Sequence, residues 1–320
     1  MITYSLRRIV SMLPILILVS VVVFFLAKMM PGDPFTGEID PNNTKPEYIE
    51  EMREKLGYND PIPTQYARWI GNFVQGDFGK STKYKKPAIE VIKDKLPNTI
   101  FLAVCALIIT YLLAFSLGMY AGRKPHTIGD HAIGIFNYGG LAIPQYIVAI
   151  VAIYFFAFKL GWLPSSGSIK PGLEHGTWEF WSSRFYHVIL PAFTLGLLST
   201  ASYTQFLRND IIQNSRMDYV RSARARGTSE SSIYNKHILR NSIIPLITFF
   251  GFDLATLISG AIITETIFTY PGIGMLFIDS ITSRDYPIIM SLTMIFSLLT
   301  LLGNLVADIL YGIVDPRIRY

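Results

Sequence analysis

Six long stretches of apolar residues divide the chain, and polar or charged residues bound each of them. They cover residues 9–27, 100–121, 133–158, 188–207, 243–263 and 288–314. A segment that crosses the hydrocarbon core of a bilayer needs about 20 mostly apolar residues, so each stretch is long enough. Backbone polar groups cannot stay unpaired in lipid, which makes helices the expected form. The pattern therefore predicts an all-α membrane protein with six transmembrane helices and both termini on the same side.

The first apolar stretch follows Arg7 and Arg8, an arrangement that also begins secretory signals. The apolar part of a signal has about 7–15 residues and ends at small residues suited to cleavage. This stretch is longer, and Lys28 follows it. Residues 1–30 are therefore predicted to be a retained first transmembrane helix, which the turn sequence Pro-Gly-Asp-Pro at 31–34 ends.

Lysine and arginine are distributed unequally between the segments that connect the apolar stretches. If the N-terminus is cytoplasmic, the inner segments hold Arg7, Arg8, Arg123, Lys124, Arg208, Arg216, Arg221, Arg224, Arg226, Lys236, Arg240, Arg317 and Arg319. The short outer loops hold few basic residues, Lys170, Arg184 and Arg284 among them. Because basic residues accumulate in short cytoplasmic loops, we predict a multi-pass protein of the cell membrane with cytoplasmic N- and C-termini. The tail 314–320 is then cytoplasmic, and the long segment 31–93 is extracytoplasmic.

The composition agrees with a membrane location. Hydrophobic residues make up 51% of the chain, charged residues only 16%, and the mean hydropathy is +0.37. A soluble globular chain carries about 25% charged residues, so this one has too few to cover its own surface. The net charge of +5 follows from the basic inner loops and gives no support to nucleic-acid binding. The single cysteine, Cys105, excludes an intrachain disulfide and a metal site built from thiolates.

Two patterns stand out in the extracytoplasmic segment. Aromatic and apolar residues between 61 and 73 recur at helical spacing and give one apolar face. That face is expected to pack within the segment, lie on the membrane surface or bind a partner. The tripeptide Gly-Lys-Ser at 79–81 is similar to part of a phosphate-binding loop, but Val74 stands where that loop requires its first glycine. ATP binding by such a loop is therefore rejected for this chain.

The connector between the fourth and fifth apolar stretches has the pattern of two short helices. Asp218 is predicted to cap the first, and Gly227 suits the left-handed position that commonly follows a helix. Ser229 is predicted to cap the second, with Glu230 favourably placed in its first turn. We call this helical pair, residues 217–241, the knuckle. Short capped helices joined rigidly to neighbouring spans can transmit a displacement that a flexible loop would absorb.

Residues 219–227 read Tyr-Val-Arg-Ser-Ala-Arg-Ala-Arg-Gly and resemble the cytoplasmic EAA loop of permeases in binding-protein-dependent ABC importers. The form Tyr-Val-Arg-x-Ala-Arg-Ala-x-Gly is similar to that of the peptide and nickel branch, the oligopeptide or dipeptide permease B type. Further motifs of this branch follow in order at residues 6–8, 31–34, 76–79, 96–99, 160–164, 265–268, 271–274, 284–287 and 315–320. Arg221 and Arg240 stand where the broader family has Glu and Pro, and both fit this branch.

The resemblance implies a type I ABC importer transmembrane core at residues 94–313, with an extra N-terminal helix before it and a coupling loop at 208–242. It implies several partners: a second homologous permease subunit, two cytoplasmic ATPase subunits, an extracytoplasmic substrate-binding protein and membrane lipid. The second helix of the knuckle, about 229–235, is expected to sit in a cleft of an ATPase. The implied coupling residues are Tyr219, Arg221, Ala223, Arg224, Ala225, Gly227, Ser229, Glu230, Ile233, His237 and Arg240.

The resemblance also implies a transport subunit that is no enzyme and binds no cofactor or metal, with ATP held by the partner subunits. Peptides are the implied substrate, and nickel or a metal chelate is the alternative. Singly, the arginines of the knuckle also fit a simpler interpretation, in which they obey the charge rule for cytoplasmic loops and contact lipid headgroups. From a different class, a self-sufficient secondary transporter is the alternative, but such proteins often contain inverted repeats and none is found here.

Three acidic residues lie within or at the ends of the apolar stretches: Asp253, Glu265 and Asp308. Asp253 is near the middle of the fifth stretch, where a charge costs roughly 2.5–3.5 kcal/mol to insert. It is two residues from a stripe of small residues that begins at Gly251, so it points to a different side of the helix. Two interpretations of Asp253 remain open, a place on the translocation path and a buried hydrogen bond to a neighbouring helix. For Glu265 and Asp308 we predict structural pairing or capping.

Overall fold

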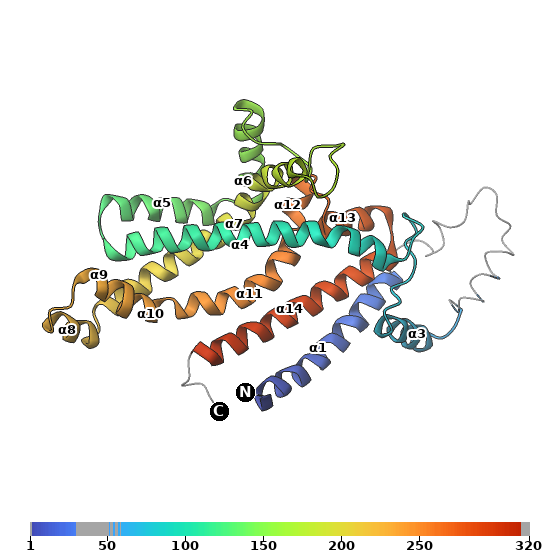
Figure 1. Cartoon of the computed structure of the whole chain (residues 1–320). Helices are drawn as coiled ribbons and strands as arrows, with labels where there is room; N and C mark the ends of the chain where they lie inside the picture. The colour runs from blue at the N-terminus through green and yellow to red at the C-terminus, as the bar shows by residue number, and fades with distance from the viewer. Residues whose placement is uncertain (1, 30–50, 52–53, 55–56, 58, 315–320) are drawn as a thin grey trace.

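The computed structural model describes residues 2–29, 51, 54, 57 and 59–314, so the predicted turn at 31–34 and nearly all of the tail 314–320 lie outside them. Their helices are α1 (Ile2–Met29), α3 (Ile62–Val74), α4 (Ala88–Arg123), α5 (Ile128–Ala142), α6 (Gln145–Ala152), η1 (Ile153–Lys159), α7 (Trp178–Ser215), α8 (Asp218–Ala225), α9 (Glu230–Ser232), η2 (Ile233–Ile238), α10 (Leu239–Ser242), α11 (Ile244–Gly260), α12 (Ile262–Ile267), α13 (Ile273–Ser283) and α14 (Tyr286–Val314). Within the described residues there is no strand, only an isolated bridge between Lys80 and Pro87. The all-α prediction is confirmed (Figure 1).

Four of the six predicted transmembrane segments are single helices that are long and apolar enough to cross a membrane, namely α1, α4, α7 and α14. The third, residues 133–158, is instead a pair of helices, α5 and α6–η1, whose axes differ by 108°. The fifth, residues 243–263, is divided between the 17-residue α11 and the short α12. Two of the predicted segments are therefore interrupted, a feature that a continuous run of apolar residues does not reveal.

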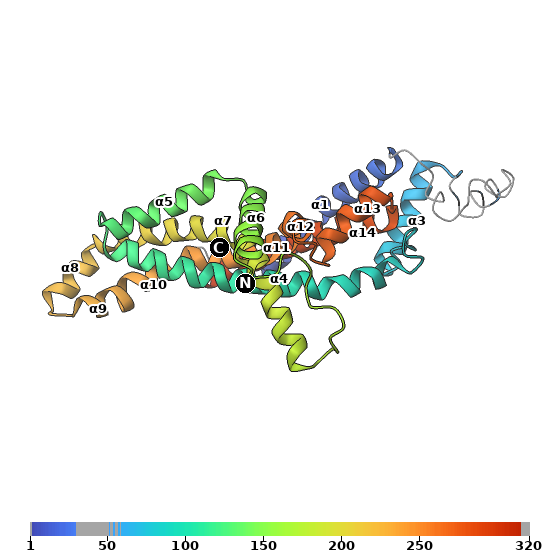
Figure 2. The ribbon, with the colours of Figure 1, turned by 90° about the horizontal axis from the view of Figure 1, so that it is seen from above.

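The bend between α5 and α6 comes from Pro144. A proline has no backbone N–H to donate and pushes the residue before it out of helical conformation. Ile143 accordingly has extended backbone angles (φ −93°, ψ 126°), and Pro144 occupies the position just before α6. Figure 2 shows α6 turned across the direction of α5. The bend thus turns α6 across the direction of α5 and packs it against α7 and α12, with Ala149 and Ala152 buried.

The centre of the bundle is the pair α4 and α7, which pack along most of their length. Small residues bring the two helices close together. A methyl group at Gly196 of α7 would lie 2.5 Å from the Thr110 hydroxyl of α4, and that hydroxyl donates to the Gly196 carbonyl at 3.2 Å. Gly118 and Gly122 of α4 accommodate Leu207 and other side chains of α7 in the same way. Close packing through small residues is the usual way that helices associate in lipid.

Helix α3, in the segment predicted to be extracytoplasmic, packs against the end of α1. Its Tyr66 and Trp69 rings lie 5.5 Å and 5.8 Å from the Phe24 ring of α1. The Tyr66 hydroxyl also bonds the Ser20 hydroxyl of α1 at 2.7 Å. The structure thus shows the apolar face of α3 packed against α1, which lies outside the segment and was not among the three expected roles.

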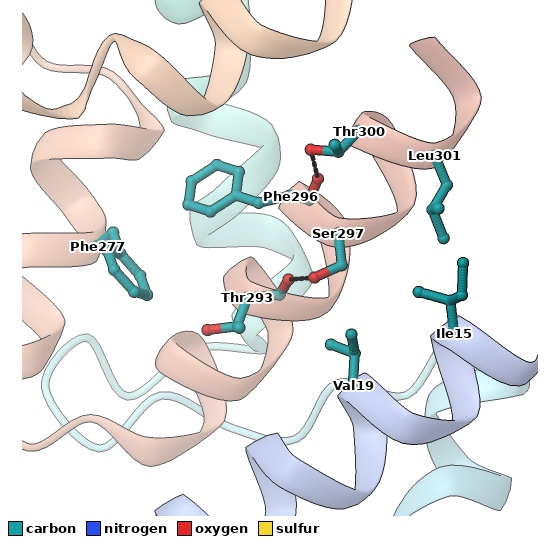
Figure 3. A pocket seen from close by; sticks show the side chains of 8 residues that line it. All are labelled: Ile15, Val19, Phe277, Thr293, Phe296, Ser297, Thr300 and Leu301. Atoms are coloured by element: carbon teal, nitrogen blue, oxygen red, sulfur yellow. Dashed lines mark hydrogen bonds between the residues drawn. The ribbon is translucent and has the colours of Figure 1, made fainter. Parts of the chain in front are cut away.

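The first and last helices lie side by side. Arg8 of α1 forms an ion pair with Asp308 of α14 at 3.1 Å, which confirms the predicted structural pairing of Asp308. Figure 3 shows the groove that α1, α13 and α14 enclose, with Ile15 and Val19 on one side. The hydroxyls of Thr293, Ser297 and Thr300, which line the groove, each donate to a carbonyl of their own helix.

Candidate functional site

The knuckle consists of two helices, as predicted, and a left-handed glycine joins them. The first helix, α8, ends at Ala225, and Gly227 follows with φ +77°. The Gly227 N–H donates to the Arg224 carbonyl at 2.9 Å, and the Thr228 N–H donates to the Ala223 carbonyl at 3.2 Å. These two bonds form a Schellman motif, which satisfies carbonyls that the end of a helix leaves unpaired. The prediction for Gly227 is confirmed.

The caps of the two helices differ from the prediction. Met217 takes the capping position of α8, and Asp218 is the first residue inside the helix, where its charge still faces the positive end of the helix dipole. Ser229 does occupy the capping position of the second helix, but its side chain makes no capping hydrogen bond. The second helix also extends through η2 and α10 to Ser242, well beyond the predicted end near residue 235.

The buried face of the knuckle is continuous with the transmembrane bundle. Val220, Ala223, Ile233 and Ile238 are fully buried together with Leu207 and Ile211 of α7 and Leu246 of α11. Asn214 at the end of α7 also donates to the Ser242 hydroxyl at 3.1 Å and accepts from the Tyr219 hydroxyl at 3.1 Å. The two short helices are therefore fixed to α7 and α11 by packing and by hydrogen bonds.

The remaining surface of the knuckle is polar and exposed. Among the predicted coupling residues, Arg221, Arg224, Ala225, Gly227, Ser229, Glu230 and Arg240 are exposed, Tyr219 and His237 are half-buried, and Ala223 and Ile233 are buried. Arg224 bridges the two helices by donating to both carboxylate oxygens of Glu230, at 2.6 Å and 3.2 Å. This hydrogen-bonded ion pair lowers the pKa of the Glu230 carboxyl below its usual value. The predicted set thus contains both the surface of the knuckle and part of its interior.

Asp253 lies in the middle of the bundle, where α4, α7 and α11 meet. Its carboxylate is buried and accepts a hydrogen bond from the Tyr111 hydroxyl at 2.7 Å and from the Tyr203 hydroxyl at 2.6 Å. Gly251, two residues earlier, is directed at Ala307 of α14. No cationic side chain among the described residues pairs with Asp253, so its partners there are the two tyrosine hydroxyls.

Glu265 caps a helix, as predicted. Its fully buried carboxylate accepts from the Gly274 N–H at 2.7 Å and the Met275 N–H at 3.0 Å, both in the first turn of α13. The Thr99 hydroxyl of α4 donates to the other carboxylate oxygen at 2.5 Å and accepts from the Ile273 N–H at 2.8 Å. Three of the motifs that carry the family resemblance, 96–99, 265–268 and 271–274, thus meet at one structural junction.

Comparison with known proteins decides the family. A family model described as "Binding-protein-dependent transport system inner membrane component" matches residues 114–320, and the model of the corresponding N-terminal region matches residues 1–103. The chain belongs to this family. It is a transport subunit rather than an enzyme, the inner-membrane permease component of a system that also includes ATPase and substrate-binding partners.

Named relatives match the permease from end to end. It is 40% identical over 321 residues to the "Oligopeptide transport system permease protein AppB" of Bacillus subtilis strain 168, with the whole of both chains covered. It is 35% identical to the "Probable peptide ABC transporter permease protein y4tP" of Sinorhizobium fredii, with 99% of each chain covered. It is 34% identical to the "Glutathione transport system permease protein GsiC" of Escherichia coli strain K12, with the whole of both covered.

The sequence analysis missed one ion pair that the permease forms. Asp130, at the start of α5, is buried and accepts two hydrogen bonds from Arg208 of α7, at 2.5 Å and 2.7 Å. It also accepts from the backbone N–H of His126 at 2.8 Å. Arg208 was assigned to the basic inner loops by its charge alone, and its partner is 78 residues earlier in the chain. A capping threonine, Thr127, was the available signal, since an acidic residue three positions after it suits the first turn of a helix.

Proposed function

We propose that the permease forms half of the translocation path of an ATP-driven peptide importer, together with a second homologous permease subunit. Two ATPase subunits bind at the knuckles, one on each permease, and the substrate-binding protein binds at the opposite end. The named relatives support peptides as the substrate, because each is described as a peptide or glutathione permease and is matched over its full length.

The observation that carries the coupling proposal is the shared core between the knuckle and the bundle. Because Val220 and Ile233 are buried together with Leu207 of α7 and Leu246 of α11, a force on the exposed side of the knuckle displaces both transmembrane helices. Close-packed interiors transmit strain, whereas a solvated loop does not. The polar, exposed face of the knuckle is then the surface offered to an ATPase.

The proposal includes the topology and the boundaries. The N- and C-termini and the coupling loop 208–242 are cytoplasmic, residues 31–93 are extracytoplasmic, and residues 94–313 form the transport core. The ion pair between Arg8 and Asp308 supports placing the two termini on one side, because it joins the beginning of α1 to the end of α14.

The test replaces Gly227 with proline. A proline has φ near −65° and no backbone N–H, so it cannot adopt φ +77° or donate to the Arg224 carbonyl. We expect ATP-dependent peptide uptake to be lost and the ATPases to be released, while the permease remains inserted. Gly172→Pro is the matched control, since this glycine also has positive φ but lies in the loop between η1 and α7. Its uptake is expected to stay near that of the wild type.

Three results would contradict the proposal. Normal uptake by the Gly227→Pro variant would remove the knuckle from the transmission of force. Uptake by the wild-type permease without ATPases would favour a self-sufficient transporter. Uptake of nickel but of no peptide would assign the permease to the metal branch.

We also propose that Asp253 lines the path and meets a positive or polar part of the substrate. This proposal is supported by the partners of the buried Asp253 carboxylate, which are the neutral hydroxyls of Tyr111 and Tyr203. A cationic group can therefore approach the carboxylate without displacing a salt bridge. Asp253→Asn is expected to reduce uptake of peptides with a free amino terminus more than uptake of acetylated peptides. Equal uptake of both by the variant and the wild type, with the complex assembled, would refute this role.

A further inference from the structure

A compact hairpin immediately precedes α4. We call residues 79–87 the lysine hairpin. The Ser81 N–H donates to the Lys86 carbonyl at 2.9 Å, and the Ala88 N–H donates to the Gly79 carbonyl at 2.9 Å. At its tip, the Lys85 N–H donates to the Ser81 carbonyl at 3.1 Å. These backbone hydrogen bonds connect the two arms of the hairpin and its tip, so they define one conformation for the turn.

A buried carboxylate fixes the hairpin to the bundle. Asp285, at the corner between α13 and α14, is fully buried and accepts a hydrogen bond from the Ser81 hydroxyl. The backbone N–H groups of Thr82 and Lys83 donate to the same carboxylate, each at 3.3 Å. Hydrogen bonds to a buried charged group are among the stronger ones in proteins. The hairpin is therefore held by a residue 202 to 204 positions away in the chain and cannot move independently of α13 and α14.

The anchored hairpin displays an unusual density of positive charge. Residues 80–86 contain four lysines and no acidic residue. All four lysine side chains are exposed, and so is Arg284, which directly precedes the anchoring aspartate. Lys85 is held at φ +58°, a left-handed conformation that residues with a side chain rarely adopt. The acid closest along the chain, Asp77, accepts a hydrogen bond from the Gly79 N–H at 2.9 Å and lies just before the lysine-bearing segment.

The hairpin lies at the end of the molecule opposite the knuckle. Figures 1 and 2 place α8 and α9 at one end, and the beginning of α4, with α3 and α13, at the other. In the proposed topology the hairpin is therefore extracytoplasmic, on the side that the substrate-binding protein must approach. Attraction to anionic lipid accounts for basic clusters on the cytoplasmic leaflet, the side away from this hairpin.

We propose that the lysine hairpin is a docking element for an acidic surface of the substrate-binding protein. This inference rests on the proposed topology and on a binding-protein partner. Complementary charge steers two proteins together and fixes their relative orientation, and a rigid display serves orientation in a way that flexible lysines would not. Anchoring by Asp285 gives the positive charges a fixed position relative to α13 and α14, so a docked protein would be held directly over the ends of these helices.

The test measures binding of the substrate-binding protein that supports peptide uptake by the wild-type transporter. The complete transporter is placed in nanodiscs of zwitterionic lipid, and the Kd is determined at several salt concentrations. For the double variant Lys83→Glu and Lys86→Glu we expect at least a tenfold higher Kd and a weaker dependence on salt. Lys159→Glu with Lys170→Glu, the same charge change on another predicted outer segment, is expected to leave the Kd within twofold of the wild type.

A second variant tests the rigid display. Ser81→Ala keeps every lysine but removes the hydroxyl that reaches Asp285, so we expect an intermediate increase in Kd. An unchanged Kd in the Lys83 and Lys86 double variant would overturn the inference. An equal increase in Kd in the Lys159 and Lys170 control variant would overturn it as well. A loss of binding that appears only in nanodiscs with anionic lipid would assign the hairpin to the lipid surface instead. If the wild type imports no peptide with any binding protein, the proposed function itself fails, which uptake measures separately.

Discussion

The capping of α13 by Glu265 allows a quantitative prediction. Glu265→Gln keeps the size and shape of the side chain but removes its charge. In the wild type the carboxylate accepts from two backbone N–H groups and one hydroxyl. A hydrogen bond to a charged group contributes about 1.5–3 kcal/mol and a neutral one about 0.5–1.5 kcal/mol, so each bond loses roughly 1 kcal/mol. The opening of this junction should therefore become easier by about 2–3 kcal/mol.

Hydrogen exchange of the purified transporter in nanodiscs measures this opening directly. Since 1.4 kcal/mol corresponds to a factor of ten, the Gly274 and Met275 amides should exchange about 30- to 140-fold faster in the variant. Glu174→Gln, which removes an exposed acid from an outer loop, is the control and should leave this exchange unchanged. If Glu265→Gln left the protection of residues 273–276 at the wild-type level, the carboxylate would not be holding the start of α13.

Two further predictions concern the bundle and the knuckle. Gly196→Ala would place a methyl group 2.5 Å from a threonine hydroxyl of α4, so we expect a loss of about 1–3 kcal/mol and a lower thermal midpoint, which scanning fluorimetry measures. In the knuckle, Glu230 should titrate by NMR below its usual pKa, and Arg224→Gln should restore the usual value. Because the pKa of Glu230 is lower in the folded state, the ion pair stabilises the fold at pH values above the unfolded-state pKa. This stabilisation is lost as the pH falls through the folded-state pKa.

Local signals predicted the helices better than their interruptions. Apolar length identified α1, α4, α7 and α14 because each is one unbroken helix. The same criterion did not predict the bend at Pro144. Hydropathy adds up side-chain contributions and takes no account of the N–H that a proline lacks. In the knuckle, Gly227 was predictable since a positive φ is a local requirement. The extension of its second helix to Ser242 depends on packing against α7 and α11, which no local pattern encodes.

The partners of the buried charges were beyond prediction for a related reason. Asp253 could be recognised as a costly residue, but its bonds to Tyr111 and Tyr203 join segments 142 and 50 residues apart. Hydropathy places each helix in the membrane without specifying its rotation or its neighbours. The pairing of Asp130 with Arg208 likewise depends on how α5 and α7 face one another. Which side chains come into contact depends on how the helices assemble. From the sequence alone, only the helix to which each residue belongs could be predicted.

The ion pair between Arg8 and Asp308 has a consequence for biogenesis. Its two residues are 300 positions apart, so α1 is made and enters the membrane well before α14. At roughly 5–20 residues per second, α1 waits about 15–60 s in the bilayer before its partner is made. During that interval the first helix must hold its orientation by itself, through the basic residues at its start. The later-made α14 is therefore the helix that secures the earlier-made α1.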